Sequence, residues 1–155
     1  MKFKIYIGAD HRGVTLKAKV VKFLSDAGYA VTDLGSFDEN VPCDYPKLSF
    51  AVAGRVSRDP QARGILICLT GIGHSIAANK VKGAYAALCQ NEETAVLSRQ
   101  HNNANILVLG ANFIKGDKIL DIIKIWLETD FEGGRHLRRV RQIKAMENKL
   151  FKAVK

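Results

Sequence analysis

The chain has 155 residues, of which 47% are apolar, and a formal net charge of +9. This length suits one domain, residues 1–155, and the apolar content excludes a disordered chain and is that of an ordinary soluble globular protein. Residues 135–155 carry eight Lys and Arg residues against one Glu, which indicates one basic terminal helix and not a nucleic-acid surface along the whole chain.

Short apolar runs alternate along the chain with helical patterns. Five runs are expected to be strands: residues 3–8, 30–34, 64–68, 84–89 and 105–110. Six segments are expected to be helices: residues 13–27, 46–57, a segment from Ser75, 91–100, a segment capped by Asp117, and 135–150. Unbroken apolar runs indicate strands buried on both faces, which is typical of parallel sheets. We therefore expect a Rossmann-like three-layer α/β/α sandwich with a five-stranded parallel sheet and a C-terminal helix.

Polar side chains follow the first two expected strands. Asp10 and His11 come directly after the first, and Asp44 and Tyr45 lie in the long loop after the second. Ligands of parallel sheets bind beyond the carboxyl ends of the strands, so these side chains could line a shared cleft. An equally simple interpretation of Asp10 is a helix cap beside an exposed histidine.

Residues 64–80 form the most informative pattern. The third expected strand ends at Cys68, and the turn that follows contains Thr70, Gly71 and Gly73. Unpaired N–H groups at a helix start favour anions, and glycines let a ligand approach the backbone closely. A thiol here is expected to have a lowered pKa, although a buried inert thiol is the simpler interpretation. The sequence has no Gly-x-Gly-x-x-Gly pattern after the first strand, which argues against dinucleotide binding.

Two further groups of side chains lie outside these turns. His101 and Asn102 are expected at the end of a helix, either as a C-cap or, through the imidazole, as a proton shuttle. Arg135 and Arg139 are four residues apart and thus share a helix face, beside His136. Guanidinium groups on one face suit a phosphate, a partner subunit or plain solvation.

The cysteines and the apolar stretches indicate where the protein works. The three cysteines, Cys43, Cys68 and Cys89, are an odd number without Cys-x-x-Cys spacing, which argues against a disulfide framework and against a zinc site. No stretch resembles a signal peptide or approaches the length of a membrane span. We therefore expect a cytoplasmic protein.

Six motifs together are more specific than any one of them. They are Gly8-Ala9-Asp10-His11, Asp44-Tyr45-Pro46, Cys68-Leu69-Thr70-Gly71-Ile72-Gly73, Ser75-Ile76-Ala77-Ala78-Asn79-Lys80, Leu97-Ser98-Arg99-Gln100-His101-Asn102 and Phe131-Glu132-Gly133-Gly134-Arg135-His136, in this order. With them the chain resembles type B ribose-5-phosphate isomerase, within the wider family that includes galactose-6-phosphate isomerase subunits. The resemblance covers roughly residues 3–147.

The resemblance implies an aldose–ketose isomerase that interconverts ribose 5-phosphate and ribulose 5-phosphate without metal or organic cofactor. It implies that Cys68 moves the proton between C1 and C2, and that His101 opens the furanose ring with help from Asp10. Thr70 and the turn amides are expected to stabilise the enediolate. The substrate-binding residues implied by the resemblance are His11, Asp44, Tyr45, Gly71, Ile72, Gly73, Asn102, Arg135, His136 and Arg139. Among them His11 and the two arginines would hold the phosphate. A homodimer with shared sites is implied, so His101 would serve the partner's thiol.

Three positions depart from the pattern of the resembled family. Leu69 replaces a usual glycine, Asn112 stands where many members carry an arginine, and His74 lies where members without the cysteine place a glutamate. We therefore keep two alternatives. One is an isomerase of a six-carbon sugar phosphate, such as allose or galactose 6-phosphate, and the other is a non-catalytic relative that binds sugar phosphates or RNA.

Overall fold

The computed structural model describes residues 2–152, and its centre is a sheet of five parallel strands. The strands are β1 (Lys4–Ala9), β2 (Ala30–Asp33), β3 (Ala62–Cys68), β4 (Ala86–Leu88) and β5 (Ile106–Gly110). Their order across the sheet is β2-β1-β3-β5-β4. Every pairing is parallel, as the unbroken apolar runs of β1, β3 and β5 predicted.

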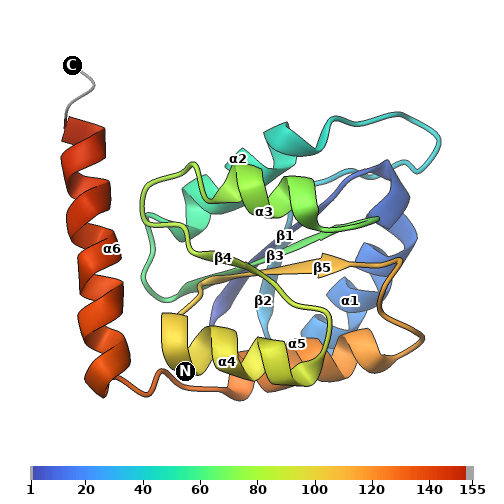
Figure 1. The fold of residues 1–155 in the computed structure, drawn as a ribbon. Helices are drawn as coiled ribbons and strands as arrows, with labels where there is room; N and C mark the ends of the chain where they lie inside the picture. The colour runs from blue at the N-terminus through green and yellow to red at the C-terminus, as the bar shows by residue number, and fades with distance from the viewer. Residues whose placement is uncertain (1, 153–155) are drawn as a thin grey trace.

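Helices cover both faces of this sheet (Figure 1). They are α1 (Val14–Asp26), α2 (Tyr45–Val56), α3 (Ile72–Ala78), α4 (Glu92–Asn102), α5 (Lys118–Glu128) and α6 (Gly134–Lys152). In Figure 1, α2 and α3 lie above the sheet and α1, α4 and α5 lie below it, whereas α6 stands to one side and contacts α4. The three-layer α/β/α sandwich with a C-terminal helix is confirmed.

Two apolar clusters hold the layers together. One joins the sheet to α1, α4 and α5 and includes the fully buried Trp126, and the other joins the sheet to α2 around Val52. Side chains alternate between the two faces along each strand, so Ile65 belongs to the first cluster and Leu66 to the second. The strands are therefore buried on both sides, and their carboxyl ends are fixed relative to one another.

One expected boundary differs from the structure at a place that matters. The helix after Cys68 begins at Ile72, three residues before the expected Ser75, because Gly71 takes a left-handed conformation (φ 80°) and starts it. The helix expected to start at Asp117 is confirmed, since Asp117 is the N-cap residue of α5. Its side chain forms an ion pair with Lys19 and makes no capping hydrogen bond, so only the expected capping bond is wrong. Among the described residues, no helix combines the length and the apolar content that crossing a membrane requires.

Candidate functional site

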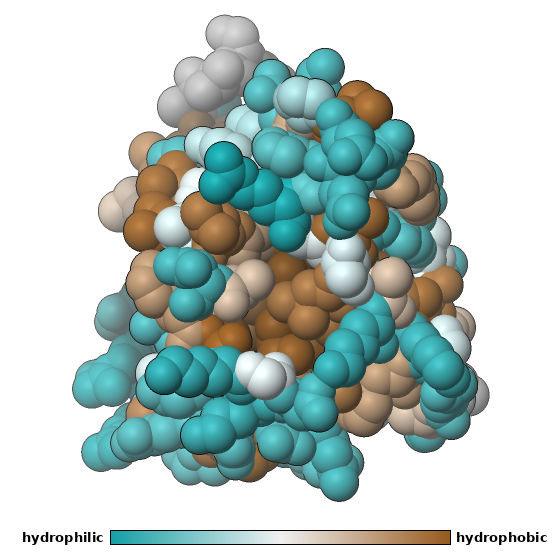
Figure 2. Space-filling view, turned by 90° about the vertical axis from the view of Figure 1, so that its right-hand side faces the viewer, coloured by the Kyte–Doolittle hydropathy of each residue, from teal (hydrophilic) through white to brown (hydrophobic). Residues whose placement is uncertain are grey.

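The sheet order brings the ends of β1 and β3 side by side. The chain runs from β1 to β2 on one side and then crosses to β3 on the other, so β1 and β3 flank a topological switch point. Ala9 pairs with Ile67 in the register of these strands, which places Asp10 and Cys68, one residue further along each, next to each other. Figure 2 looks at this end of the molecule and shows apolar side chains in its hollowed centre, with hydrophilic ones around them.

The side chain of Cys68 is buried at the carboxyl end of β3. The residue is 6% exposed, and the backbone N–H of Gly71 donates a hydrogen bond to Sγ at 3.0 Å. Burial raises the pKa of the Cys68 thiol, while the backbone N–H groups of Gly71 and Thr70 lower it by less. The expected lowering of this pKa at a helix start is therefore wrong for the single chain, because loss of hydration outweighs the donors.

The two glycines of the turn allow the close approach of neighbouring groups. A Cβ on Gly71 would lie 2.4 Å from Cδ1 of Leu88, and its positive φ already disfavours other residues. A Cβ on Gly73 would lie 2.6 Å from the ring of Tyr45. Tyr45 comes from the start of α2, so the turn and the aromatic ring pack against each other.

Asp10 and His11 form the opposite part of the site. Asp10 caps the short helical turn that follows β1, because its Oδ1 accepts a hydrogen bond from Arg12 N–H at 3.0 Å. The backbone N–H of Cys43 donates to Nδ1 of His11 at 3.3 Å. Neutral His11 therefore carries its proton on Nε2, which leaves an N–H donor for an anionic ligand. Both interpretations of Asp10 therefore fit the structure: the residue caps the turn, and it also lies next to Cys68.

His74 and Ser49 form a buried pair behind the turn that the sequence did not reveal. His74 is fully buried, and its Nδ1 lies 2.7 Å from Oγ of Ser49, which itself donates to the carbonyl of Tyr45 at 3.0 Å. Burial lowers the pKa of His74 to about 4, so the ring is neutral near pH 7. The ring also meets Tyr45 edge-on at 5.7 Å. The pair ties α3 to α2 and supports Tyr45.

The other expected site residues form a second cluster. The rings of His101 and His136 are stacked, with centroids 4.0 Å apart and an angle of 5° between the planes. Nε2 of His136 accepts a hydrogen bond from Nε of Arg135 at 3.3 Å and lies 3.5 Å from a carboxylate oxygen of Glu132. Desolvation, His101 and Arg135 lower the pKa of His136. Arg139 is exposed one turn further along α6. Glu132 was not among the expected site residues, since a lone exposed acid carries no sequence signal.

The chemistry of this second cluster suits an anion better than a metal ion. His101, Glu132 and His136 offer ligand atoms within 4.8 Å of one another. The two parallel stacked rings, however, cannot both direct a lone pair at one ion without rotating. The neighbouring guanidinium group of Arg135 also repels a cation and attracts a phosphate.

The two clusters lie at opposite ends of the sheet in one chain. Cys68, Asp10 and the glycine turn follow the carboxyl ends of strands, whereas His101 ends α4, which returns to the edge where the strands begin. Figure 1 shows this end of α4 beside the start of α6, away from the end toward which the strands point. The structure thus brings together the thiol, Thr70 and the residues of the first loops. It separates them from His101, Asn102 and the arginines.

Comparisons with known proteins agree on one family. The sequence profile described as Ribose/Galactose Isomerase matches residues 5–143. The probable ribose-5-phosphate isomerase B of Mycoplasma genitalium is 46% identical over 92% of this chain and 95% of its own length. The ribose-5-phosphate isomerase B of Escherichia coli is 41% identical over 94% of this chain and 97% of its own.

Solved structures give the same result. The ribose-5-phosphate isomerase B of Clostridium thermocellum has a TM-score of 0.91 at 47% identity, covering 95% of this chain and 99% of that one. The crystal structure of the Mycoplasma genitalium enzyme with bound ribulose 5-phosphate has a TM-score of 0.92 at 44% identity, covering 96% of this chain and 98% of that one.

Proposed function

Because the chain belongs to the ribose/galactose isomerase family, we propose that it interconverts ribose 5-phosphate and ribulose 5-phosphate. It is an aldose–ketose isomerase, as its named relatives are. The observation that carries the residue assignment is the position of the Cys68 thiol at the switch point, beside Asp10 and a turn whose Gly71 N–H donates to the sulfur.

In this proposal the thiolate of Cys68 takes the proton from the carbon next to the carbonyl group and returns it to the neighbouring carbon. The reaction passes through an enediolate, whose negative oxygen needs donors that are already in place. Thr70 and the amides of Gly71 to Gly73 are suited to this role, because they belong to the turn between Cys68 and α3, whose Gly71 N–H donates to the sulfur. Asp44 and Tyr45 line the sugar position.

We propose that a second copy of the chain supplies the other half of each site. Within one chain His101 lies at the far end of the sheet from Cys68, so ring opening at the same sugar needs the partner's His101. Apolar side chains are exposed on α6 and on α3, as a subunit interface requires: Ile143, Met146, Leu150, Phe151, Ile72 and Ile76. A two-fold dimer pairs the two different clusters twice and thus makes two complete sites.

The partner's cationic groups would also favour the thiolate form of Cys68. In the single chain, burial holds the pKa of Cys68 above its ordinary value. Guanidinium groups of Arg135 and Arg139 favour a nearby anion, both the substrate phosphate and a thiolate. His11, with its Nε2–H free, is suited to bind the same phosphate from the chain that carries the thiol.

A substrate panel tests this function. Purified protein should turn over ribose 5-phosphate faster than allose 6-phosphate or galactose 6-phosphate. Cys68→Ala should lose roughly a hundredfold or more in kcat with KM nearly unchanged, because only the proton-transfer group is removed. Preference for a six-carbon phosphate would favour the alternative substrate, and a Cys68→Ala variant at the wild-type rate would refute the base assignment.

The three cysteines are free, which fits the reducing cytoplasm where we place the reaction.

A further inference from the structure

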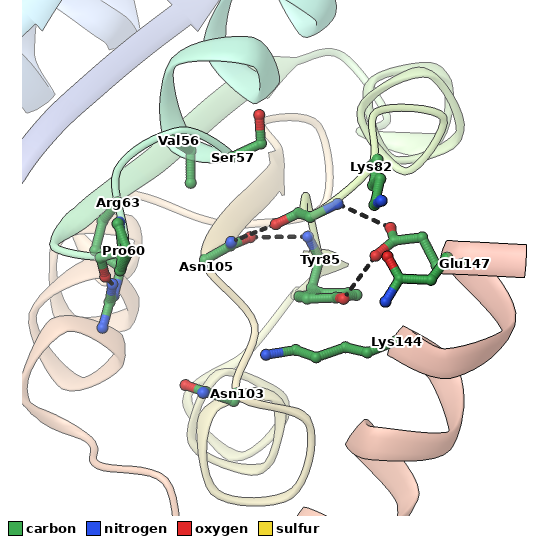
Figure 3. A pocket seen from close by; sticks show the side chains of 12 residues that line it. Val56, Ser57, Pro60, Arg63, Lys82, Tyr85, Asn103, Asn105, Lys144 and Glu147 are labelled. Carbon is green, nitrogen blue, oxygen red and sulfur yellow. Dashed lines mark hydrogen bonds between the residues drawn. The ribbon is translucent and has the colours of Figure 1, made fainter. Parts of the chain in front are cut away.

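A cavity of about 480 Å³ lies at the edge of the sheet where the strands begin (Figure 3). Its lining residues come from the end of α2, the turn after it and β3, from the segments between α3 and β4 and between α4 and β5, and from α6. The charged ones are Arg63, Lys82, Lys144 and Glu147. The volume lies within the usual range of small-molecule sites, which is about 300–1,000 Å³.

The acceptor groups of this cavity are already occupied by the protein. One carboxylate oxygen of Glu147 accepts from the N–H of Gly83 at 2.8 Å and the other from the hydroxyl of Tyr85 at 3.1 Å. The amide of Asn105 accepts from Tyr85 N–H at 2.8 Å and donates to the Gly83 carbonyl at 2.8 Å. These bonds, drawn in Figure 3, make a rigid floor in which every side-chain oxygen of Glu147 and Asn105 already accepts one hydrogen bond.

The donor groups, in contrast, are free. Within residues 2–152 the ammonium groups of Lys82 and Lys144 have no ion-pair or hydrogen-bond partner; Lys144 lies 5.9 Å from the centre of the Tyr85 ring. One terminal nitrogen of Arg63 donates to the carbonyls of Pro60 and Ala62, at 3.4 and 2.9 Å. Its other N–H groups have no hydrogen-bond partner within the described chain, and its guanidinium group lies over the Phe3 ring, 4.1 Å from the ring centre. A pocket whose free groups are charged donors selects a ligand made of acceptors.

We propose that this cavity binds the phosphate group of a small organic phosphate, with Lys144 and Arg63 as the charged donors. The site is separate from the isomerase site, because it lies between α6 and the beginning of the sheet and contains none of the residues assigned to the reaction. Three cations and one carboxylate line the cavity, and both oxygens of that carboxylate already accept hydrogen bonds, so the local field favours a dianion. The stem of Lys144 extends from α6 along the Tyr85 ring into the open part of the cavity (Figure 3).

Amide NMR with the full chain tests the proposal, with inorganic phosphate and pyrophosphate as probes at constant ionic strength. The amide signals of Gly83 and Tyr85 should shift saturably. Lys144→Ala should weaken this binding roughly tenfold, the usual loss for one charged hydrogen bond. Lys149→Ala removes the same charge from the same helix outside the cavity and should bind like the wild type. Isomerase turnover of Lys144→Ala should be unchanged.

Three results would overturn the proposal. Shifts at Gly83 that do not saturate would mean that no site exists. Equal weakening by Lys144→Ala and Lys149→Ala would mean that the ions respond only to the overall charge of α6. Shifts that vanish in Arg139→Ala would mean that the probes bind at the isomerase site. The turnover assay tests the proposed isomerase function separately.

Discussion

His74 should make the folded protein lose stability in mild acid. The ring is fully buried, its Nδ1 contacts Ser49, and its Nε2 has no hydrogen-bond partner in the described part of the chain. A proton on this ring would place a charge in the interior, where the negative charge of Asp10 offsets only part of the lost hydration. Burial therefore lowers the pKa of His74 to about 4 in the folded state, whereas an unfolded chain has the ordinary value of about 6.5.

The sign and size of the effect follow from proton linkage. Between pH 6.5 and 4 the unfolded state binds a proton that the folded state rejects, so stability is complete above pH 6.5 and falls toward pH 4. At about 1.36 kcal/mol per pKa unit, the whole shift corresponds to about 3 kcal/mol. Of this, about 2 kcal/mol should be lost between pH 7 and pH 4.5.

Urea unfolding at pH 7 and pH 4.5 measures this loss, and a His74→Gln variant isolates it. Glutamine can keep a hydrogen bond to Ser49 but does not titrate, so the variant should lose less stability than the wild type by about 2 kcal/mol. Other groups titrate equally in both proteins and cancel in the comparison. If both proteins lost the same stability on acidification, His74 would not be a buried neutral base.

Three further predictions concern the site itself. Gly73→Ala should lower kcat/KM by roughly tenfold with little change in unfolding free energy, because its Cβ would displace the half-exposed ring of Tyr45, 2.6 Å away. Arg139→Ala should raise KM for ribose 5-phosphate by roughly tenfold and change kcat less, because it removes one phosphate contact. In Arg135→Ala the pH at which kcat/KM levels off should be higher than in the wild type, because burial raises the pKa of Cys68 and the variant lacks the partner's guanidinium group that opposes this shift.

Each of these three predictions has a control variant or a result that would contradict it. Gly54→Ala adds the same methyl group in α2 where nothing lies within 4 Å, and should leave kcat/KM unchanged. Arg138→Ala removes an equal charge beside Arg139, and an equal rise in KM for both would mean that only net charge matters. The same pH profile in Arg135→Ala and in the wild type would mean that this guanidinium group does not act on the thiol.

The architecture could be predicted from sequence because it depends on local patterns. The apolar runs ending in Ala9, Cys68 and Gly110 have no polar alternation, and only a sheet covered on both faces buries them. The start of α3 was misplaced because Gly71 looks like loop sequence, whereas its left-handed conformation starts the helix. The strand order that pairs Ala9 with Ile67 has no local signal and came only with the fold.

The sequence could predict which residues belong to the site, but not which residues each of them contacts. The sequence suggested a lowered pKa for Cys68 from the helix start, and burial reverses it in the single chain. The pairs Ser49–His74 and Glu132–His136 join residues whose contacts depend on how helices pack. Spacing in sequence also gave no sign that His101 would lie at the other end of the sheet from the thiol.

Activity of mixed dimers tests the shared site most directly. Cys68→Ala and His101→Ala are each expected to be nearly inactive alone, because each removes one group from both sites. After the two proteins are mixed and their subunits exchange at random, half of the dimers hold both chains, and one of the two sites in each is intact. About a quarter of the wild-type activity should then return. If the mixture stays as inactive as its parts although exchange is demonstrated, thiol and imidazole do not meet across a subunit boundary.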